Sequence, residues 1–132
     1  MKYLLALIGE EGWAEDASPE EMKAEMDRWS AYGQEVIDDG VFLAGEALQD
    51  SHTASTVRLE QGKDPIVSDG PFAESKEQLG GFYLFECKDL DEALEYAKRI
   101  PYPKGSVEVR PVMDFSEYGY EGPAGTKEKA SA

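Results

Sequence analysis

The chain contains little cysteine, little histidine and few basic residues, and each shortage excludes a class of protein. Cys87 is the single cysteine among 132 residues, so an internal disulfide and a CxxC redox or zinc site are excluded. His52 is the single histidine, which excludes a metal site with several histidine ligands. The net charge of −15 argues against nucleic acid or an anionic membrane as a partner. We expect the Cys87 thiol to be buried and inert, and His52 to lie exposed in a polar loop.

Long apolar runs are also missing. The N-terminal run covers only residues 3–8, far short of the roughly 18 residues of a membrane span and too short for a signal peptide. The length is that of one domain, which buries roughly two-thirds of its unfolded surface and needs no metal or disulfide to fold. We therefore expect a soluble cytoplasmic protein without a cofactor or a bound metal.

The hydrophobic pattern predicts a series of strands. Residues 3–8 and 81–87 are apolar at both sets of alternating positions, which is typical of strands buried on both faces. Turn signals at residues 61–64 and after Asp69 separate the shorter apolar runs. The remaining strands are expected at residues 41–46, 56–60, 65–68 and 106–113.

Two helices carry capping signals and apolar stripes. Ser18 is the expected N-cap of the first helix, with Pro19 at its first position and Glu21 completing a capping box. In the second helix Asp89 is the expected N-cap, and Glu92 completes the capping box. The expected stripe of the first helix is Met22, Met26, Trp29, Val36 and Ile37, and that of the second is Leu90, Ala93, Leu94, Ala97 and Ile100.

The order of these elements predicts an α+β fold of the ferredoxin-like, split βαβ type, with a β-hairpin insertion, over residues 1–113. Residues 114–132 form a C-terminal tail, whose last ten residues we expect to be disordered. Two helices cover only one face of a four-stranded sheet, yet two central strands are apolar on both faces. A second copy of the sheet is the natural cover, so the sequence predicts a homodimer with facing sheets.

Residues 68–82 read SDGPFAESKEQLGGF and contain most of the candidate functional residues. Asp69 ends a short strand just before Gly70 and Pro71. Its carboxylate can act as a general base or bind a polar ligand, or else accept hydrogen bonds from the amides of its own turn. Phe72 is expected to turn inward as an apolar plug that pins the loop to the sheet.

The same segment continues with two acidic residues and a double glycine. Glu74 and Glu77 are three residues apart, so a short helical turn would place them on one face. They then form an acid/base pair, a cation site or a solvated surface turn. Gly80 and Gly81 are expected to permit a close backbone approach or a bulge.

Charged and aromatic residues in the strands supply the other candidates. Arg58 and Arg110 either bind an anionic ligand or form ion pairs, with Asp69 or Glu46 as the expected partners. Strand aromatics either line a pocket or pack in the core, and they comprise Tyr3, Phe82, Tyr83 and Phe85. The candidate catalytic residue is Asp69, and the candidate ligand contacts are Arg58, Gly70, Pro71, Phe72, Glu74 and Tyr83.

Residues 68–82 also resemble a known family. They are similar to the signature of the DGPF branch of the YCII-related proteins, which runs close to DGPFAETKEQLGGF. The resemblance extends over residues 1–113 and includes MKYLLALIGEE, AGEALQ, TVRLEQGK, DLDEALEYAKRIP and GSVEVRPVM. It implies a ferredoxin-like fold of the dimeric α/β-barrel kind, in agreement with the pattern of strands and helices.

The resemblance has one departure that bears on function. The wider family is associated with a His-Asp pair whose histidine follows a proline early in the first helix, but Pro19 is followed here by Glu20 and Glu21. The pair cannot be carried over, and Asp69 matches its second member by position alone. Some members of the wider group are lyase-like enzymes acting on substituted hydroquinones, a role that fold alone does not transfer.

Two functions follow from these observations. The first is a homodimeric small-ligand-binding or regulatory module, which the missing histidine favours. The alternative is a lyase- or isomerase-like enzyme of small molecules with Asp69 as its general base. A dry aromatic pocket containing Asp69 would favour the enzyme, whereas an Asp69 bonded to backbone amides would favour the binding module.

Overall fold

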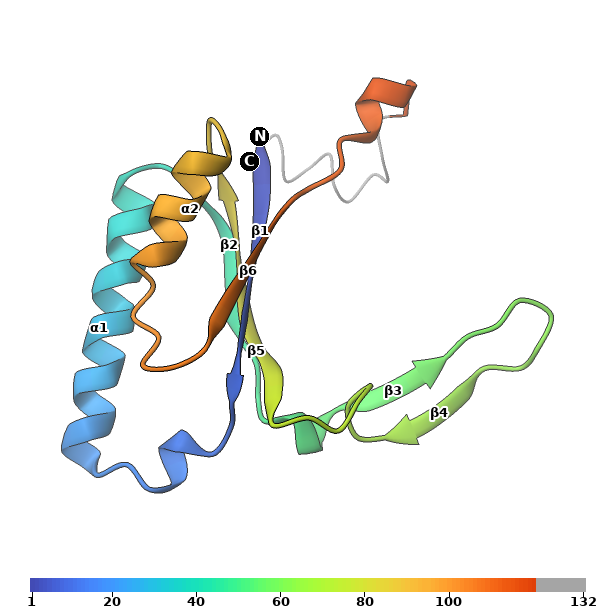
Figure 1. Ribbon diagram of the computed structural model, residues 1–132, viewed down its shortest axis with the longest axis horizontal. Coiled ribbons are helices and arrows are strands. Elements are labelled where there is room, and N and C mark those ends of the chain that lie inside the picture. The colour runs from blue at the N-terminus through green and yellow to red at the C-terminus, as the bar shows by residue number, and fades with distance from the viewer. Residues whose placement is uncertain (121–132) are drawn as a thin grey trace.

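The computed structural model describes residues 1–120 and contains a four-stranded antiparallel sheet with two helices packed on one face (Figure 1). The strands follow the order β2-β5-β1-β6, which is the ferredoxin-like arrangement and confirms the predicted fold class. The last ten residues of the tail, for which disorder is predicted, lie outside the described residues. The elements of this layer are β1 (Lys2–Glu10), α1 (Pro19–Asp38), β2 (Phe42–Ala47), β5 (Glu77–Glu86), α2 (Leu90–Lys98) and β6 (Ser106–Pro111).

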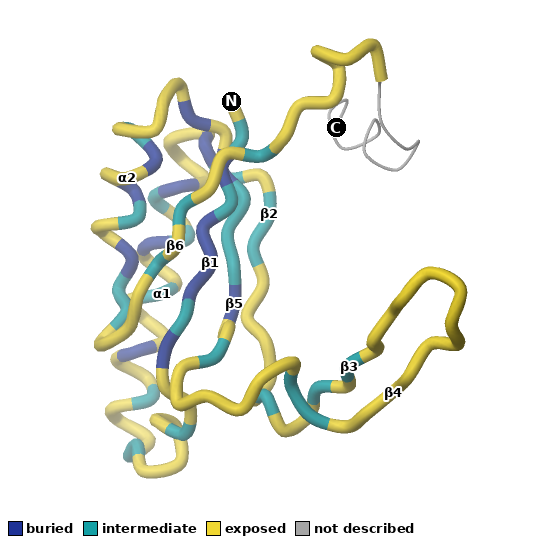
Figure 2. The backbone as a smooth tube through the Cα atoms, turned by 45° about the vertical axis from the view of Figure 1, so that its right-hand side comes forward, coloured by how far each residue is buried: buried dark blue, intermediate teal, exposed yellow. Residues whose placement is uncertain are grey.

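The predicted hairpin insertion forms a separate two-stranded sheet, made of β3 (Ser55–Arg58) and β4 (Ile66–Asp69). It leaves the main sheet on the side opposite the helices and is exposed along most of its length (Figure 2). Its exposed apolar side chains are Val57, Leu59, Ile66 and Val67. The described residues also contain three short 3-10 turns: η1 (Trp13–Glu15), η2 (Ser51–Thr53) and η3 (Phe115–Tyr118).

The helix caps form as the sequence predicts. The Ser18 hydroxyl accepts a hydrogen bond from the Glu21 amide at 3.1 Å, and the Glu21 carboxylate accepts one from the Ser18 amide at 3.0 Å. The Asp89 carboxylate accepts from the Glu92 amide at 2.9 Å. Glu92 reaches back to the Lys88 amide, one residue before the cap, so the second box closes one position earlier than predicted. These bonds satisfy amides that a helix start leaves unpaired.

The apolar stripe predicted for α1 is partly wrong. Met26 and Ile37 are 61% and 54% exposed, whereas Glu25 and Tyr32 are buried. The buried face runs through residues 25, 29, 32 and 36, which is a regular helical spacing that includes one acidic residue. On α2, Leu90 and Leu94 are likewise exposed, and the buried positions are Ala93 and Tyr96.

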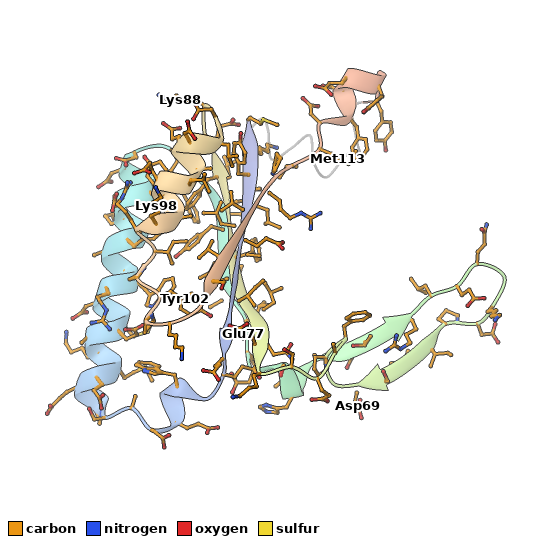
Figure 3. All side chains as sticks on the ribbon, viewed as in Figure 1. Asp69, Glu77, Lys88, Lys98, Tyr102 and Met113 are labelled. Carbon is orange, nitrogen blue, oxygen red and sulfur yellow. The ribbon has the colours of Figure 1, made fainter. Side chains whose placement is uncertain are left out.

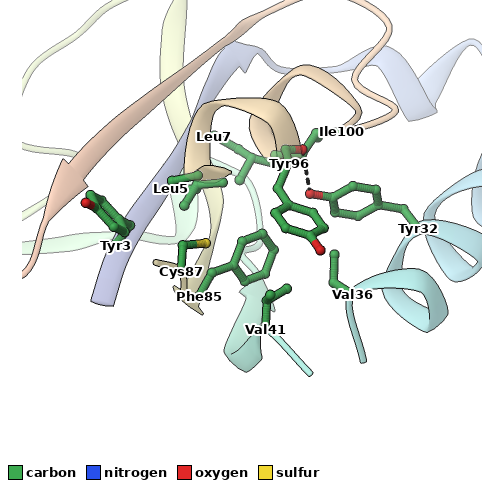
Figure 4. Packing of buried hydrophobic residues seen from close by; sticks show 11 residues of the cluster. Tyr3, Leu5, Leu7, Tyr32, Val36, Val41, Phe85, Cys87, Tyr96 and Ile100 are labelled. Atoms are coloured by element: carbon green, nitrogen blue, oxygen red, sulfur yellow. Dashed lines mark hydrogen bonds between the residues drawn. The ribbon is translucent and has the colours of Figure 1, made fainter. Parts of the chain in front are cut away.

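The core lies between the helices and one face of the sheet (Figure 4). Leu5, Val36 and Phe85 are its largest fully buried side chains. The Tyr32 hydroxyl donates to the Tyr96 carbonyl at 2.8 Å, and the Tyr96 hydroxyl donates to the Asp39 carboxylate at 2.7 Å. Both tyrosines therefore bury their rings without leaving a hydroxyl unpaired. The rest of the core cluster is Tyr3, Leu7, Val41, Cys87, Ala93 and Ile100.

The opposite face of the sheet is also apolar, as predicted for its two central strands. Leu4 of β1 lies opposite Leu84 of β5, and Ala6 lies opposite Phe82. Tyr83 contacts Tyr32 of α1, so its neighbours in β5 point to the other face. Both described helices lie on the Tyr83 side, which leaves the Leu84 side, here called the open face, without a covering layer within residues 1–120 (Figure 1). No helix in this part of the chain combines the length and hydrophobicity needed to cross a membrane.

Candidate functional site

A cavity of about 780 Å³ lies between the N-terminal half of α1 and one end of the sheet, where β1 and β2 finish and β5 begins. Its volume falls within the range of small-molecule binding sites, roughly 300–1,000 Å³. Most of its lining is apolar, and the aromatic and methionine residues that contribute to it are Trp13, Met22, Met26, Trp29, Phe82, Tyr83 and Tyr102.

The rings of Tyr83 and Tyr102 occupy space that is free because the neighbouring residues are glycines without a side chain. A Cβ atom on Gly9 would lie 2.9 Å from Cζ of Tyr102, and one on Gly105 would lie 2.7 Å from Cε2 of the same ring. A Cβ atom on Gly45 would lie 2.7 Å from Cδ1 of Tyr83. The rings therefore lie directly against the backbone of the sheet and the loop before β6, and any larger residue would displace them.

The double glycine of β5 also borders the cavity. Leu7 pairs with Gly81 and Ile8 pairs with Leu79, which leaves Gly80 as the extra residue of a β-bulge. A Cβ atom on Gly81 would lie 2.8 Å from the carbonyl oxygen of Glu46 in the neighbouring strand. Both expectations for this pair, a bulge and a close backbone approach, are confirmed.

Glu25 is the buried charged residue of the cavity wall, with 5% of its surface exposed. Its Oε2 accepts a hydrogen bond from Nε1 of Trp29 at 3.1 Å, and its Oε1 forms an ion pair with Arg28. A buried carboxylate requires such partners, because burial without them is costly. Sequence reasoning missed Glu25 because it drew the stripe of the first helix from apolar residues alone, although the spacing of Glu25 from Trp29 and Tyr32 places it on the buried side.

Further ionisable groups surround the cavity. Glu10, Glu11 and Glu46 contribute to its lining, together with Lys104. Hydrogen bonds from the side chain and amide of Ser51 lower the pKa of Glu11. Burial raises the pKa of the Tyr83 and Tyr102 hydroxyls, the latter helped by the charge of Glu77, so both remain protonated donors at neutral pH. Within residues 1–120, no group of three or more potential metal ligands is placed to hold a metal ion.

Asp69 lies outside this cavity, exposed at the base of the hairpin (Figure 3). Within the described chain its carboxylate makes no hydrogen bond or ion pair, so the expected bonds to amides of its own turn are not formed. The turn is held by the backbone instead. The Gly70 amide donates to the Ala54 carbonyl at 2.7 Å, and the Thr56 hydroxyl donates to the Gly70 carbonyl at 2.8 Å. The role of Asp69 as a general base stays a prediction.

Phe72 is 77% exposed, so the expectation of an inward plug is wrong for the single chain. The hairpin points away from the main sheet, so the loop after it starts at a distance from the core of the described residues. The ring lies instead beneath the Arg58 guanidinium, with 5.6 Å between Cζ of Arg58 and the ring centroid. Glu74 is exposed and Glu77 belongs to β5, so the two do not share a helical turn.

Of the candidate ligand contacts, Tyr83 lines the cavity, whereas Arg58, Gly70, Pro71, Phe72 and Glu74 lie on the hairpin or the loop that follows it. Arg110 pairs with Glu108 at 3.9 Å rather than with Asp69 or Glu46. Cys87 is buried as predicted, and this burial raises the pKa of its thiol. His52 lies exposed in η2, also as predicted.

Known proteins match this chain over nearly all of the described residues. The family model of the YCII-related domain matches residues 1–116, which include the sheet, both helices, the hairpin and the cavity. An uncharacterized protein of Rhizobium meliloti (strain 1021) is 38% identical over 115 residues, which amount to 85% of this chain and 92% of the relative. Assignment to the DGPF branch within the family stays a prediction.

Proposed function

The chain belongs to the YCII-related domain family, and on that premise we propose that it is a homodimeric protein that binds a small, largely apolar molecule in the cavity between α1 and the sheet. The observation that carries the proposal is the cavity itself, about 780 Å³ of space beside a close-packed core. Concave, mostly apolar spaces of this size are where proteins usually bind small molecules, and this one opens to solvent, so a ligand can enter it.

The lining supports an apolar ligand. Tyr83 and Tyr102 lie against glycine backbone and provide flat aromatic walls. Met22 and Met26 lie on α1 across the cavity, and their flexible thioether side chains adapt to ligands of different outline. Aromatic walls combined with adaptable methionines are a common composition for sites that hold apolar molecules.

The open face supports the homodimer. Leu4, Ile8, Phe82 and Leu84 form a half-buried apolar surface across the two central strands, and a contiguous apolar patch of this kind marks an interaction site. The hairpin and residues 113–120 both extend on this side of the sheet and flank the open face (Figure 1). A second copy presents the same apolar surface, and a two-fold axis between the two sheets satisfies both copies at once.

The cavity can be tested with 2-phenylethanol as a neutral apolar probe. Both tryptophans of the chain, Trp13 and Trp29, line the cavity, so their fluorescence reports on its occupation. Native protein should show a saturable change in emission as the probe is added. Ala47→Leu adds bulk at a cavity-lining position and should weaken this response, whereas Ala31→Leu makes the same change on the exposed surface of α1 and should preserve it.

Two results would contradict the proposal. One is the absence of any saturable response up to the solubility limit of 2-phenylethanol. The other is an equal response in the Ala47→Leu and Ala31→Leu variants, because binding would then occur away from the cavity.

A further inference from the structure

The charges around the cavity restrict the chemistry of its ligand, an inference that rests on the proposed function. We propose that the cavity takes an amphiphilic amine, meaning an aromatic or aliphatic body that carries a protonated amino group. The apolar lining receives the body of the molecule. The ammonium group binds where Glu25 meets the rings of Trp29 and Tyr102.

The ionisable residues of the lining favour a cation. Among residues 1–120, four carboxylates contribute to it against one ammonium group, that of Lys104, and these are Glu10, Glu11, Glu25 and Glu46. Glu25 is buried, so its charge acts at close range with little screening, and the exposed carboxylates add a weaker field of the same sign that repels an anion and attracts an ammonium group. The net charge of −15 over the whole chain adds a field of the same sign.

Glu25 is the anchor for the ammonium group. Its two oxygens accept from Trp29 and Arg28, but a carboxylate offers about four acceptor positions, so capacity remains for a ligand donor. The Arg28 side chain is 54% exposed, which leaves much of its guanidinium in water and limits how far it offsets the carboxylate on the cavity side. The Trp29 hydrogen bond holds the carboxylate in a fixed position.

Trp29 and Tyr102 form an aromatic corner next to this carboxylate. Their ring centroids are 6.0 Å apart and their planes meet at 70°, so they stand as two nearly perpendicular walls. An ammonium group is attracted to the face of such rings within about 6 Å of the centroid. Because Glu25 is bonded to the edge of the Trp29 ring, its negative charge reinforces the attraction at this corner.

Three probes with the same phenyl ring and different charges test the inference: 2-phenylethylammonium, 2-phenylethanol and phenylacetate. The native protein, titrated through its tryptophan emission, should bind the ammonium compound about tenfold more tightly than the alcohol, the factor expected from one charge-assisted hydrogen bond. Phenylacetate should bind more weakly than the alcohol. The ammonium preference should shrink as salt concentration rises.

Variants that remove one charge show which residues cause the preference for the ammonium compound over the alcohol. Glu25→Gln keeps the shape of the side chain and should abolish the ammonium preference while the alcohol still binds. Lys104→Gln removes the cation of the lining at an exposed position and should raise ammonium affinity, an effect that loss of structure would not produce. Glu95→Gln removes the same charge as Glu25→Gln on the exposed surface of α2 and should leave both affinities unchanged.

The two proposals fail in different ways. If the alcohol binds in the cavity as tightly as the ammonium compound, the amine inference is overturned and the proposed function stands. The inference is also overturned if Glu25→Gln and Lys104→Gln both leave the preference unchanged. If none of the three probes binds, the proposed function falls and the amine inference falls with it.

Discussion

Replacing Gly9 with alanine should force the Tyr102 ring out of its position beside the cavity. The new Cβ atom would lie 2.9 Å from Cζ of Tyr102 and 3.3 Å from the carbonyl oxygen of Lys104. Overpacking of this kind costs roughly 1–3 kcal/mol. The ring is only half-buried and its far end can move, so we expect the free energy of unfolding to fall by about 1–2 kcal/mol, toward the lower part of that range.

The cost should depend on Tyr102, which a double-mutant cycle can measure. In a Tyr102→Ala background the colliding ring is gone, and the remaining contact with the Lys104 carbonyl requires only a small adjustment. Glycine-to-alanine replacement then acts mainly by restricting the unfolded chain, which stabilises by about 0.4–1 kcal/mol where the backbone allows alanine. The coupling energy between the two positions should therefore exceed about 1 kcal/mol.

Urea unfolding followed by far-ultraviolet circular dichroism provides the measurement, at one fixed protein concentration because dimer stability depends on concentration. Gly33→Ala is the matched control. A Cβ atom on Gly33 would meet no atom within 4 Å in α1, so this change should stabilise the helix slightly. An equal cost of Gly9→Ala in the native and Tyr102→Ala backgrounds would refute the argument that the glycine exists to accommodate the ring.

Three further predictions concern other parts of the molecule. If the proposed dimer forms, Leu84→Glu, in the middle of the open face, should convert it to a monomer in light scattering, while Leu94→Glu on the exposed side of α2 should not. A native monomer at micromolar concentration would contradict the proposed dimer. The hydrogen bond to Asp39, helped by burial, raises the pKa of Tyr96 from 10.0 to about 12, so the stability it contributes is complete below pH 10 and is lost as the pH rises toward 12. Urea midpoints across this range should fall less steeply for Tyr96→Phe than for the native chain, and parallel curves would refute the assignment. Phe72→Ala should change the stability of the single chain by no more than about 0.5 kcal/mol, because the ring is exposed, and a larger loss in a monomeric variant would mean that it packs on its own chain.

The fold could be predicted because its signals are local in the sequence. Ser18, Glu21 and Asp89 are capping residues whose partners lie a few positions away, and the structure contains their hydrogen bonds. In β1 and β5 both sets of alternating positions are apolar, and this pattern correctly predicts that both faces of the sheet are apolar. Which face the helices cover depends on packing between distant elements, so the sequence alone left open whether Phe82 or Tyr83 faces outward.

The cavity could not be predicted because its lining comes from separate parts of the chain. Trp13 lies in η1, Glu25 and Trp29 lie in α1, and Tyr102 lies in the loop before β6. Each of these residues is typical of the element in which it lies, so none stands out in the sequence as part of a site. Only tertiary packing brings the four residues together. The segment around Asp69 is recognisable in the sequence as a motif, but Asp69 lies at the base of the hairpin, away from the cavity. The spacing of residues in a hairpin does not encode the direction in which the hairpin leaves the sheet, so this position could not be predicted.

Methionine methyl groups offer the most direct test that the cavity is a ligand site. The chain has four methionines, of which Met22 and Met26 line the cavity, while Met1 and Met113 are exposed outside it. With methyl-labelled methionine, addition of 2-phenylethylammonium or 2-phenylethanol should shift the nuclear magnetic resonance signals of Met22 and Met26 in a saturable way. The signals of Met1 and Met113 should stay in place. Unchanged Met22 and Met26 signals at the highest soluble probe concentrations, or equal shifts at all four methionines, would contradict the account.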